Sequence, residues 1–520
     1  MAKYGEQVMK AARGITAIAM AVSLLAGCSS GAKSGDGKGN AGSESPAPSA
    51  SAPAAVSESA SSVAPVSKIT YMLPFNTAEP PREDNIFWKK IEELTGTDVQ
   101  ITWVPDSGYT DKTAAVIASG DMPDVIGVNG SAQYKSGVIL NAIQSGLFWD
   151  LGPYLKDYPN LNPDNMNRIT ASNFKIDGKF YGLYRETYIS RNGLYFRNDW
   201  LQKLNLKEPE TMDDLYAMLK AFSENDPDGN GADDTYGLVL EKSEYSYFPV
   251  WFGAPNVWGE KDGQLYPAFE HPRYLDALKF LKKLYDEKLI NQDFALFNVS
   301  KANDAINAGK GGAFARNVST LLKFQKIADD LQKIGAVEGP DGKFAYSENG
   351  YIMVFLIPKT SVKTEEHLRQ VLAFMDRLAS REIQDLWEWG VEGAHYEVKD
   401  GLIVQTDAEK FAADRPGIQF IGIALKKDVS PGKYDSIMQM LNETSEANEP
   451  IAVGNPAAGL ISKTYFERGS DLDILLQDAD LKFIMGSIDE NGWKSALDVW
   501  RKQGGDKVIS EFNEALAKQS

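Results

Sequence analysis

Apolar positions near the start of the globular chain alternate between helical and strand spacing. Phe87, Ile91 and Leu94 recur at helical spacing, and this pattern stops at Gly96. Short apolar or alternating runs before and after it are typical of strands. The predicted order is strand 69–73, helix ending at 96, strand 99–103, helix 111–119 and strand 125–128. Such alternation with short turns predicts a parallel, doubly wound α/β sheet.

A second α/β body is predicted after Gly182. Residues 194–196 have the pattern of a strand, and Thr211 with Asp214 forms a capping box at the start of a helix. Longer helices are predicted at 272–287 and 365–387, where apolar residues recur at helical spacing. We find no internal repeat of about 20–50 residues.

The length of 520 residues predicts two domains or one large bilobed body. Asp and Glu number 72 against 54 Lys and Arg, a net charge of −18, which argues against nucleic acid as a partner. A single cysteine excludes an intramolecular disulfide and a cysteine-built zinc site, and three scattered histidines make a histidine-rich metal site improbable.

The N-terminus has the pattern of a bacterial export signal. Basic residues precede an apolar run over 15–26, which is too short for a helix of about 20 residues that spans a membrane. The run ends Leu25-Ala26-Gly27-Cys28, which resembles the lipobox of bacterial lipoproteins. We therefore expect residues 1–27 to be removed and Cys28 to carry lipid such as palmitate. The alternative is an ordinary secretory signal with a chance cysteine.

Residues 28–67 are rich in Ser, Ala, Gly and Pro, and they are predicted to be a disordered tether. A flexible chain of that length spans roughly 35 Å, enough to hold a globular body away from a membrane. No other segment approaches a membrane span. The predicted location is the extracellular face of the cell membrane, anchored by lipid, of a Gram-positive bacterium.

The most specific chemical motif is an acidic, glycine-rich loop at 226–234. Oxygen-bearing side chains stand at loop positions 1, 3, 5 and 9, with Gly231 at position 6, a spacing that suits Ca²⁺. Position 12 is Gly237, where an EF-hand has a bidentate Glu, so another ligand would have to complete the shell. The alternative is a turn held only by hydrogen bonds. The predicted ligands of a structural calcium ion are Asp226, Asp228, Asn230, Ala232 through its carbonyl, and Asp234.

Aromatic residues cluster in irregular stretches beside Asp, Glu, Asn and Arg. Flat rings and directed hydrogen bonds suit sugars, although any one aromatic residue is more often part of a core. No Gly-x-Ser-x-Gly, phosphate-loop or His-Glu-x-x-His pattern occurs, and no motif singles out a pair of carboxylates for glycoside hydrolysis. The pattern favours binding over catalysis, and we expect no enzymatic activity. The aromatic candidates for a cleft are Tyr184, Tyr188, Trp251, Trp258, Trp387 and Trp389.

Several segments in order resemble the family 1 extracellular solute-binding proteins of ABC importers, above all the oligosaccharide-type lipoproteins of Bacillus and Paenibacillus and the related alginate-oligosaccharide binders. They span residues 70–460, nearly the whole globular chain. The segments are 91–96, 118–124, 197–201, the capping-box helix with the 226–235 loop, 390–396 and 455–460.

The resemblance implies an α/β fold of the maltose-binding-protein type, with two lobes and a ligand cleft between them. The lobes would comprise residues 68–185 with 346–450 and 186–345 with 451–520, and the chain would cross near 182–190, 338–346 and 448–455. It also implies that the acidic loop binds calcium in a structural role. Family binders of alginate have a carboxylate directly after the ninth loop position, where this chain has Thr235.

By segment position, the resemblance also implies a set of ligand contacts in the cleft. The implied function is a monomeric substrate-binding lipoprotein that captures an oligosaccharide and delivers it to an ABC permease. Alternatives are a surface sugar sensor for a two-component system and a lipoprotein glycoside hydrolase or lyase. The implied contacts are Asn76, Asn129, Ser131, Tyr184, Glu186, Tyr188, Trp251, Trp258, Arg316, Glu392 and His395.

Overall fold

A computed structural model describes residues 63–317, 331–334, 336–423 and 429–518. The predicted signal segment, Cys28 and most of the predicted tether lie outside these ranges. Within them, no helix combines the length and the apolar character needed to cross a membrane.

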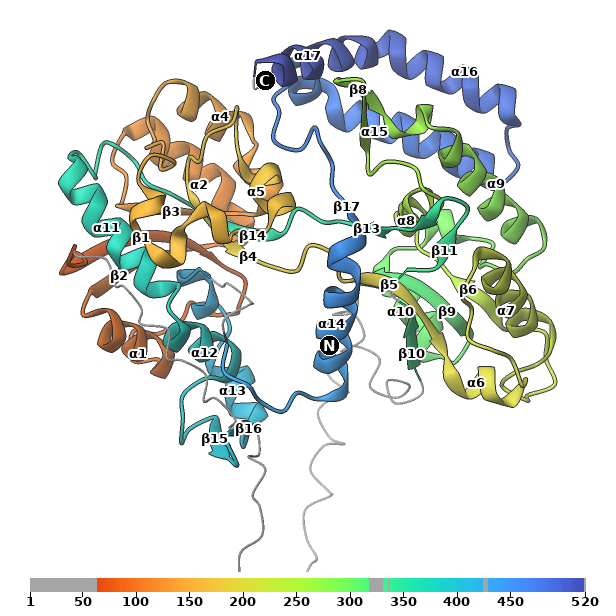
Figure 1. Ribbon diagram of the computed structural model, residues 1–520, viewed down its shortest axis with the longest axis horizontal. Helices are drawn as coiled ribbons and strands as arrows, with labels where there is room; N and C mark the ends of the chain where they lie inside the picture. The colour runs from red at the N-terminus through yellow and green to blue at the C-terminus, as the bar shows by residue number, and fades with distance from the viewer. Residues whose placement is uncertain (1–62, 318–330, 335, 424–428, 519–520) are drawn as a thin grey trace, which may run out of the picture. The chain divides into compact units, whose positions relative to one another are not determined.

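The first lobe is built on a five-stranded sheet with the order β2-β1-β3-β14-β4 (Figure 1). Strand β1 is parallel to β2 and β3, whereas β14 is antiparallel to both β3 and β4. The sheet is therefore mixed rather than wholly parallel, because β14 enters it from the opposite direction. The elements are β1 (Lys68–Phe75), α1 (Ile86–Thr95), β2 (Asp98–Pro105), α2 (Asp106–Ser119), β3 (Val125–Asn129), α3 (Gly130–Tyr134), α4 (Gly137–Gln144), α5 (Arg168–Phe174), β4 (Leu183–Glu186), β14 (Tyr351–Leu356), α11 (Glu365–Leu378), α12 (Arg381–Trp389), β15 (Tyr396–Lys399), β16 (Leu402–Gln405) and α13 (Ala408–Asp414).

The patterns that predicted this lobe correspond to its core. Phe87 and Ile91 on α1 are fully buried, and Gly96 ends the helix in the left-handed conformation at φ 68°. The apolar run of β3 is buried along its first four residues because helices cover both faces of the sheet. The predicted strands and helices of this lobe are therefore present.

The second lobe contains a four-stranded sheet with the order β10-β5-β9-β6, in which only β6 and β9 pair in parallel. Three C-terminal helices, α15 to α17, belong to the same lobe (Figure 1). The elements are β5 (Asn192–Arg197), α6 (Asn198–Lys203), α7 (Met212–Glu224), β6 (Tyr236–Val239), α8 (Tyr247–Trp251), β7 (Trp258–Lys261), β8 (Gln264–Pro267), α9 (Pro272–Asp286), α10 (Val299–Asn307), β9 (Gly311–Asn317), β10 (Leu331–Ile334), β11 (Glu338–Gly339), β12 (Gly342–Lys343), α14 (Ser436–Asn448), α15 (Lys463–Ile484), α16 (Glu490–Trp500) and α17 (Asp506–Ala517).

Strand β5 shows how this sheet divides two cores. Leu194 and Phe196 belong to the larger cluster, while Tyr195 faces the smaller one, as expected when successive side chains point to opposite faces. The capping box of α7 is present: the Thr211 hydroxyl accepts from the Asp214 N–H, and the Asp214 carboxylate accepts from the Thr211 N–H. Helix α14 packs on the smaller cluster through Leu441.

Two sequence-based expectations differ from the structure. The helix predicted at 365–387 is two helices, α11 and α12, because Ser380 is extended at ψ 154° and begins the second one. The predicted lobe boundary at 450 would place α14 in the first lobe, whereas α14 contacts β5 and β10 of the second. The other boundaries remain predictions.

Candidate functional site

Two chain segments lead between the second lobe and the first sheet, and hydrogen bonds join these segments to each other. Residues 187–191 lead from β4 to β5, and residues 347–350 lead from β13 (Ala345–Tyr346) to β14. Strand β13 also pairs in parallel with β17 (Ala452–Val453) (Figure 1). The Ser190 hydroxyl donates to the Tyr346 carbonyl at 2.8 Å, and the Thr187 N–H donates to the Gly350 carbonyl at 2.9 Å. The crossings therefore form a joint of several connected strands.

Three hollows follow one another along this joint. The first has a volume of about 560 Å³, and the second, of about 300 Å³, shares Val257, Asn349 and Asn455 with it. We call these two hollows together the junction groove. The third, of about 400 Å³, shares Thr187 with the second and lies against α14. The junction groove is lined from both lobes, since α3 and α5 contribute on one side and β7, α15 and α17 on the other.

The junction groove combines aromatic rings with amide side chains. Phe466 on α15 is 50% exposed, and Trp258 and Phe512, both nearly buried, line the same hollow with their ring centroids 5.0 Å apart. Asn349 and Asn455 line the place where the two hollows meet. Flat apolar faces next to hydrogen-bonding amides suit a ligand that has both apolar faces and hydroxyl groups.

Val257 stands in the groove in a strained conformation. Its φ is 62°, a left-handed value that a β-branched residue rarely adopts, and its side chain is 52% exposed. The preceding Asn256 is buried, and its amide donates to the Ser347 and Val453 carbonyls at 2.9 Å each. These two bonds join the loop before β7 to both strands of the joint. Strain of this kind concentrates at functional sites.

Some of the predicted ligand contacts lie at these hollows. Ser131 and Trp258 line the junction groove, and the Ser131 hydroxyl accepts from the Tyr351 hydroxyl at 3.2 Å. Glu186 and Tyr188 line the third hollow. The structure thus brings these four predicted residues to the joint between the lobes, although into two different hollows.

Other predicted aromatic contacts lie in hydrophobic cores instead. Tyr184 and Trp387 belong to the core of the first lobe and Trp251 to that of the second, each no more than 3% exposed. Trp389 is 4% exposed and donates from its indole N–H to the Ser430 carbonyl. Their large apolar rings fill space between helices and sheets, so these positions do not line the described groove.

The remaining predicted contacts do not line the junction groove. Asn76 and Asn129 are exposed at the ends of β1 and β3, and Glu392 is exposed in the loop before β15. His395 is fully buried, with Nε2 3.1 Å from Asp414 Oδ2 and Nδ1 accepting from the Val391 N–H. His395 therefore joins its loop to α13.

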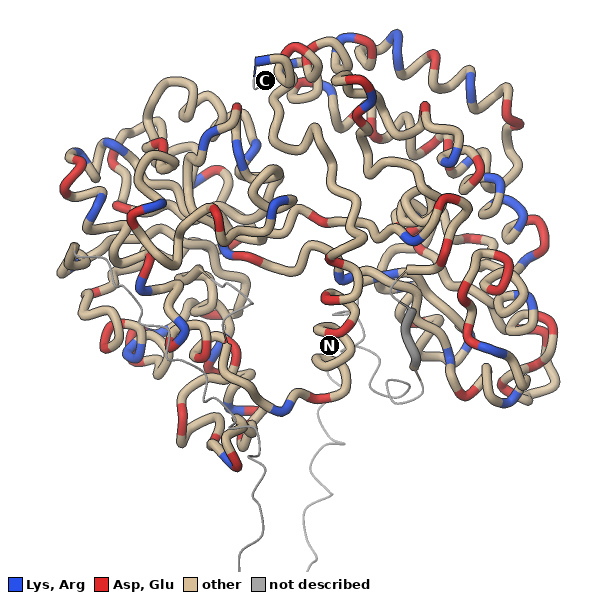
Figure 2. Tube along the Cα trace, viewed as in Figure 1, with Lys and Arg blue, Asp and Glu red and all other residues tan. Residues whose placement is uncertain are grey.

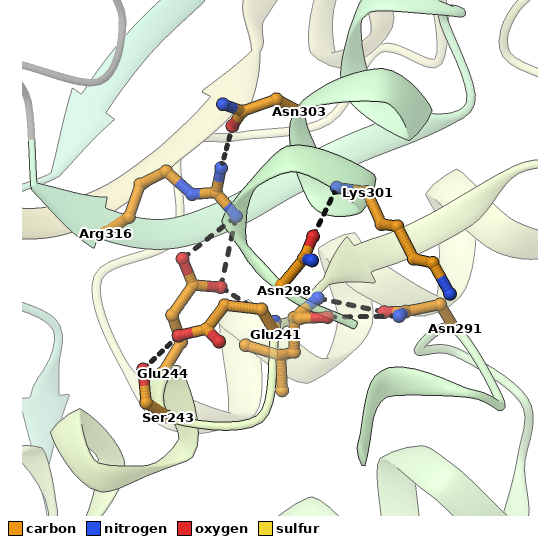
Figure 3. A network of polar contacts seen from close by, with 9 residues as sticks. Glu241, Ser243, Glu244, Asn291, Asn298, Lys301, Asn303 and Arg316 are labelled. Atoms are coloured by element: carbon orange, nitrogen blue, oxygen red, sulfur yellow. Dashed lines mark hydrogen bonds and ion pairs between the residues drawn. The ribbon is translucent and has the colours of Figure 1, made fainter. Parts of the chain in front are cut away.

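Arg316, another predicted contact, belongs to a buried network in the second lobe (Figure 3). Its guanidinium lies 2.9 Å from the Glu244 carboxylate and donates to Asn303 Oδ1 at 2.7 Å. Burial raises the pKa of Glu244 to about 7, although Arg316 opposes this shift. A buried ion pair of this kind belongs to the interior of the lobe and does not present a free charge to a ligand.

Sequence reasoning missed Val257, Asn349 and Phe466 as groove residues. The motif 455–460 does contribute to the groove, through Asn455 and the run 457–460, but it was not predicted as a ligand contact. The sequence around Phe466 predicts an amphipathic helix but not which neighbour that helix faces. Nothing in the sequence indicates the strained φ at Val257. An exposed aromatic ring can be identified as a groove residue only from the three-dimensional arrangement of both lobes.

The acidic loop at 226–234 has the oxygen donors that Ca²⁺ prefers. The Asp226 carboxylate accepts from the N–H groups of Gly229, Asn230 and Gly231 at 3.0–3.1 Å. The Asn230 amide donates to Asp228 at 2.8 Å and to Asp234 at 3.1 Å. These contacts turn the four side chains toward one another within the loop.

Loop position 12 is closed to any side chain. A Cβ on Gly237 would lie 2.2 Å from the Leu219 carbonyl oxygen, because β6 packs directly on α7 there. Lys310 lies 3.3 Å from Asp234, and hydrogen bonds from Asn230 and Lys310 lower the pKa of that carboxyl. Across the described part of the chain, no group of three or more His, Cys, Asp or Glu side chains is gathered as a metal site. The donor set fits calcium only with water completing the shell.

Comparisons with known proteins give the family. The model of the bacterial extracellular solute-binding protein family matches residues 77–385, more than half of the chain. The chain is 38% identical to lipoprotein LipO of Bacillus subtilis, over 88% of this chain and 93% of that protein. It is 36% identical to the polygalacturonan/rhamnogalacturonan-binding protein YtcQ of the same organism, over 86% and 91%.

Solved structures support the fold. An HMO-binding, ABC-transporter-associated solute-binding protein of Bifidobacterium longum infantis has a TM-score of 0.67 at 17% identity, over 87% of this chain and 98% of that one. FusA of Streptococcus pneumoniae in complex with kestose has a TM-score of 0.64 at 18% identity, over 86% and 99%. Another structure of FusA, with a TM-score of 0.63 at 18% identity over 86% and 99%, is described as an EF-hand mutant. The predicted two-lobed α/β fold is confirmed, and the chain belongs to the family of bacterial extracellular solute-binding proteins.

Proposed function

We propose that this protein is the substrate-binding lipoprotein of an ABC importer, which captures an oligosaccharide in the junction groove and delivers it to a membrane permease. The observation that carries the proposal is the junction groove itself, lined from both lobes by aromatic and amide side chains. The relatives YtcQ and FusA are named as a polygalacturonan/rhamnogalacturonan-binding protein and a fructooligosaccharide transporter substrate-binding protein. A ligand that contacts both lobes would shift the equilibrium between open and closed forms toward the closed form. The size of the shift equals the difference between its affinities for the two forms.

Binding without turnover is part of the proposal, since the family comprises binding proteins. A bound oligosaccharide should be recovered unchanged after prolonged incubation with the protein. Shortened or modified sugar would contradict the proposal and favour a hydrolase or lyase.

Anchoring through lipid at Cys28 is also part of the proposal, supported by the lipobox-like sequence and by the relative named lipoprotein LipO. Labelling of growing cells with palmitate tests it. Incorporation that disappears in a Cys28→Ala variant would support the anchor, and unlabelled protein would contradict it.

Replacement of Phe466 by alanine should weaken oligosaccharide binding by at least tenfold while changing the stability of the ligand-free protein little. The ring is 50% exposed, so its loss removes a stacking surface rather than core packing. The full Cys28→Ala chain is screened against oligosaccharides by thermal shift, and affinities of the hits are measured by calorimetry. A ligand at about 100 times its Kd adds about 2.7 kcal/mol to stability.

Ile474→Ala provides the matched control, because Ile474 is 61% exposed on the same helix and does not line the groove. This variant should bind like the parent. Unaltered binding by Phe466→Ala would place the ligand elsewhere. A screen without any oligosaccharide hit would refute the proposed cargo.

Calcium should raise the thermal midpoint of the protein by several degrees if the 226–234 loop holds the ion. The residues that would hold it are Asp226, Asp228, Asn230, Asp234 and the Ala232 carbonyl, where the ion would neutralise the gathered carboxylates. Asp228→Ala should abolish the increase. Asp233→Ala serves as the control. Asp233 is an exposed carboxylate next to Asp234, and it is not a predicted ligand. An equal response of both variants would exclude this loop as the site.

A further inference from the structure

The junction groove carries an unusual charge for this acidic protein. Acidic and basic positions are interspersed along the described chain (Figure 2), and the whole chain has a net charge of −18. Only two charged residues line the groove, Lys135 from the loop after α3 and Glu348 from a crossing. The partners of these two residues decide what charge the groove offers to a ligand.

Glu348 is fully engaged with its neighbours. Its Oε2 accepts from Arg191 Nη2 at 2.9 Å and from Arg191 Nε at 3.1 Å. Its Oε1 accepts from the amides of Asn192 and Asn317 at 3.2 Å each. The negative charge of Glu348 is therefore balanced by Arg191 and does not determine the field in the groove.

Lys135 has no acidic partner in the ranges that the structure describes. Its ammonium donates to two main-chain carbonyls, that of Asn173 at 2.9 Å and that of Ala458. A lysine ammonium has three hydrogens, so these two bonds fix its position and leave one donor. Burial lowers the pKa of Lys135 to about 8, as expected for a cation withdrawn from water without a counter-charge.

The position of Lys135 places this charge where both lobes meet. Asn173 belongs to α5 of the first lobe, and Ala458 lies in the segment that leads into α15 of the second. The next residue, Ser136, stands at the N-terminus of α4, lines the groove and makes no capping hydrogen bond with its side chain. The N-terminus of a helix carries a partial positive charge.

Lys135 is partly buried, and cations withdrawn from water are normally paired, so an anion that completes this site is favoured. We infer that the junction groove binds a sugar unit that carries a carboxylate, that is, a uronic acid, with its carboxylate on the ammonium of Lys135. The inference rests on the proposed function and specifies the class of its ligand. A charge-assisted hydrogen bond of this kind corresponds to about a 10- to 100-fold preference over the same sugar without the charge.

The test uses matched ligands that differ only in charge. Acidic oligosaccharides from galacturonan, rhamnogalacturonan, alginate and glucuronoxylan are titrated calorimetrically into the full Cys28→Ala chain, each beside its methyl ester, together with neutral oligosaccharides. We expect one acid to bind about 10- to 100-fold more tightly than its ester and than any neutral sugar. Its affinity should fall with added salt, while that of the ester should not.

Lys135→Met should reduce the preference for acid over ester to about one, with little change in affinity for the ester. Lys179→Met, which alters an exposed lysine of the same lobe outside the groove, should retain the preference. The ester comparison in the parent protein stands even if Lys135→Met fails to fold.

A neutral oligosaccharide as the tightest ligand would overturn the inference while leaving the proposed function intact. A folded Lys135→Met variant that keeps the preference for the acid would likewise overturn the inference and leave the proposed function intact. Absence of binding to every sugar would overturn the proposed function and the inference together.

Discussion

Replacement of Arg316 by methionine should lower the free energy of unfolding by about 3–5 kcal/mol at pH 8. The Arg316 and Glu244 side chains are only 3% and 6% exposed, so the change leaves a carboxylate buried without its cation. Urea unfolding followed by tryptophan fluorescence measures the loss. Arg316 lies at the end of β9 in the network of Figure 3, and we expect the second lobe to unfold first.

The loss should depend on pH in a defined direction. The pKa of Glu244 is already raised to about 7 by burial, and removal of Arg316 would raise it further. A carboxyl whose folded pKa is raised contributes stability that is present at low pH and lost as pH rises through the folded pKa. The variant should therefore come closer to the parent at pH 5.5 than at pH 8.

A double variant, Arg316→Met with Glu244→Gln, provides the control. It removes both charges, and it should be more stable at pH 8 than Arg316→Met alone. If the double variant is destabilised relative to the parent by the sum of the losses of the two single variants, the two side chains do not interact through charge.

Replacement of Asp480 by leucine should lower the free energy of unfolding by about 4 kcal/mol, because it leaves three buried donors without an acceptor. Asp480 is fully buried on α15 and accepts from the Tyr274 hydroxyl at 2.6 Å, the Trp493 indole at 2.8 Å and the Tyr245 hydroxyl at 3.0 Å. These bonds fix the helix that carries Phe466 into the groove. Thermal and urea unfolding measure the effect.

Asp480→Asn keeps the shape and removes the titration. Burial raises the pKa of Asp480 to about 6, against the hydrogen bonds that lower it. The stability that this carboxyl contributes is thus present below about pH 4 and lost as pH rises through about 6. The advantage of the parent over Asp480→Asn should shrink by about 2–3 kcal/mol between pH 4 and pH 7. A constant difference across that range would contradict the assignment.

Local patterns predicted most elements of the fold. The spacing of Phe87 and Ile91, the stop at Gly96 and the capping box at Thr211 depend on neighbours within one turn, so they can be read along the chain. The antiparallel entry of β14 and the placement of α14 on the second sheet depend on distant partners. The spacing of apolar residues in those two segments does not specify which sheet each of them joins.

The site was less predictable for the same reason. Trp251 and Trp258 look alike as aromatic residues in a polar stretch, and both belong to the core of the second lobe, yet only Trp258 also lines the groove. Nothing in the sequence distinguishes Lys135 from the other lysines, so it was not predicted as a site residue. Its importance comes from the two carbonyls, far apart along the chain, that hold it between the lobes.

The place of β14 in the first sheet sets an order in which the chain can fold. This strand lies between β3 and β4 but follows both of them in the sequence, after most of the second lobe. The first sheet therefore cannot close until that long intervening segment is available, and such distant pairings form slowly. A chain that leaves the cell before β14 is synthesised has no complete lobe to unfold, which suits the export expected of an extracellular protein.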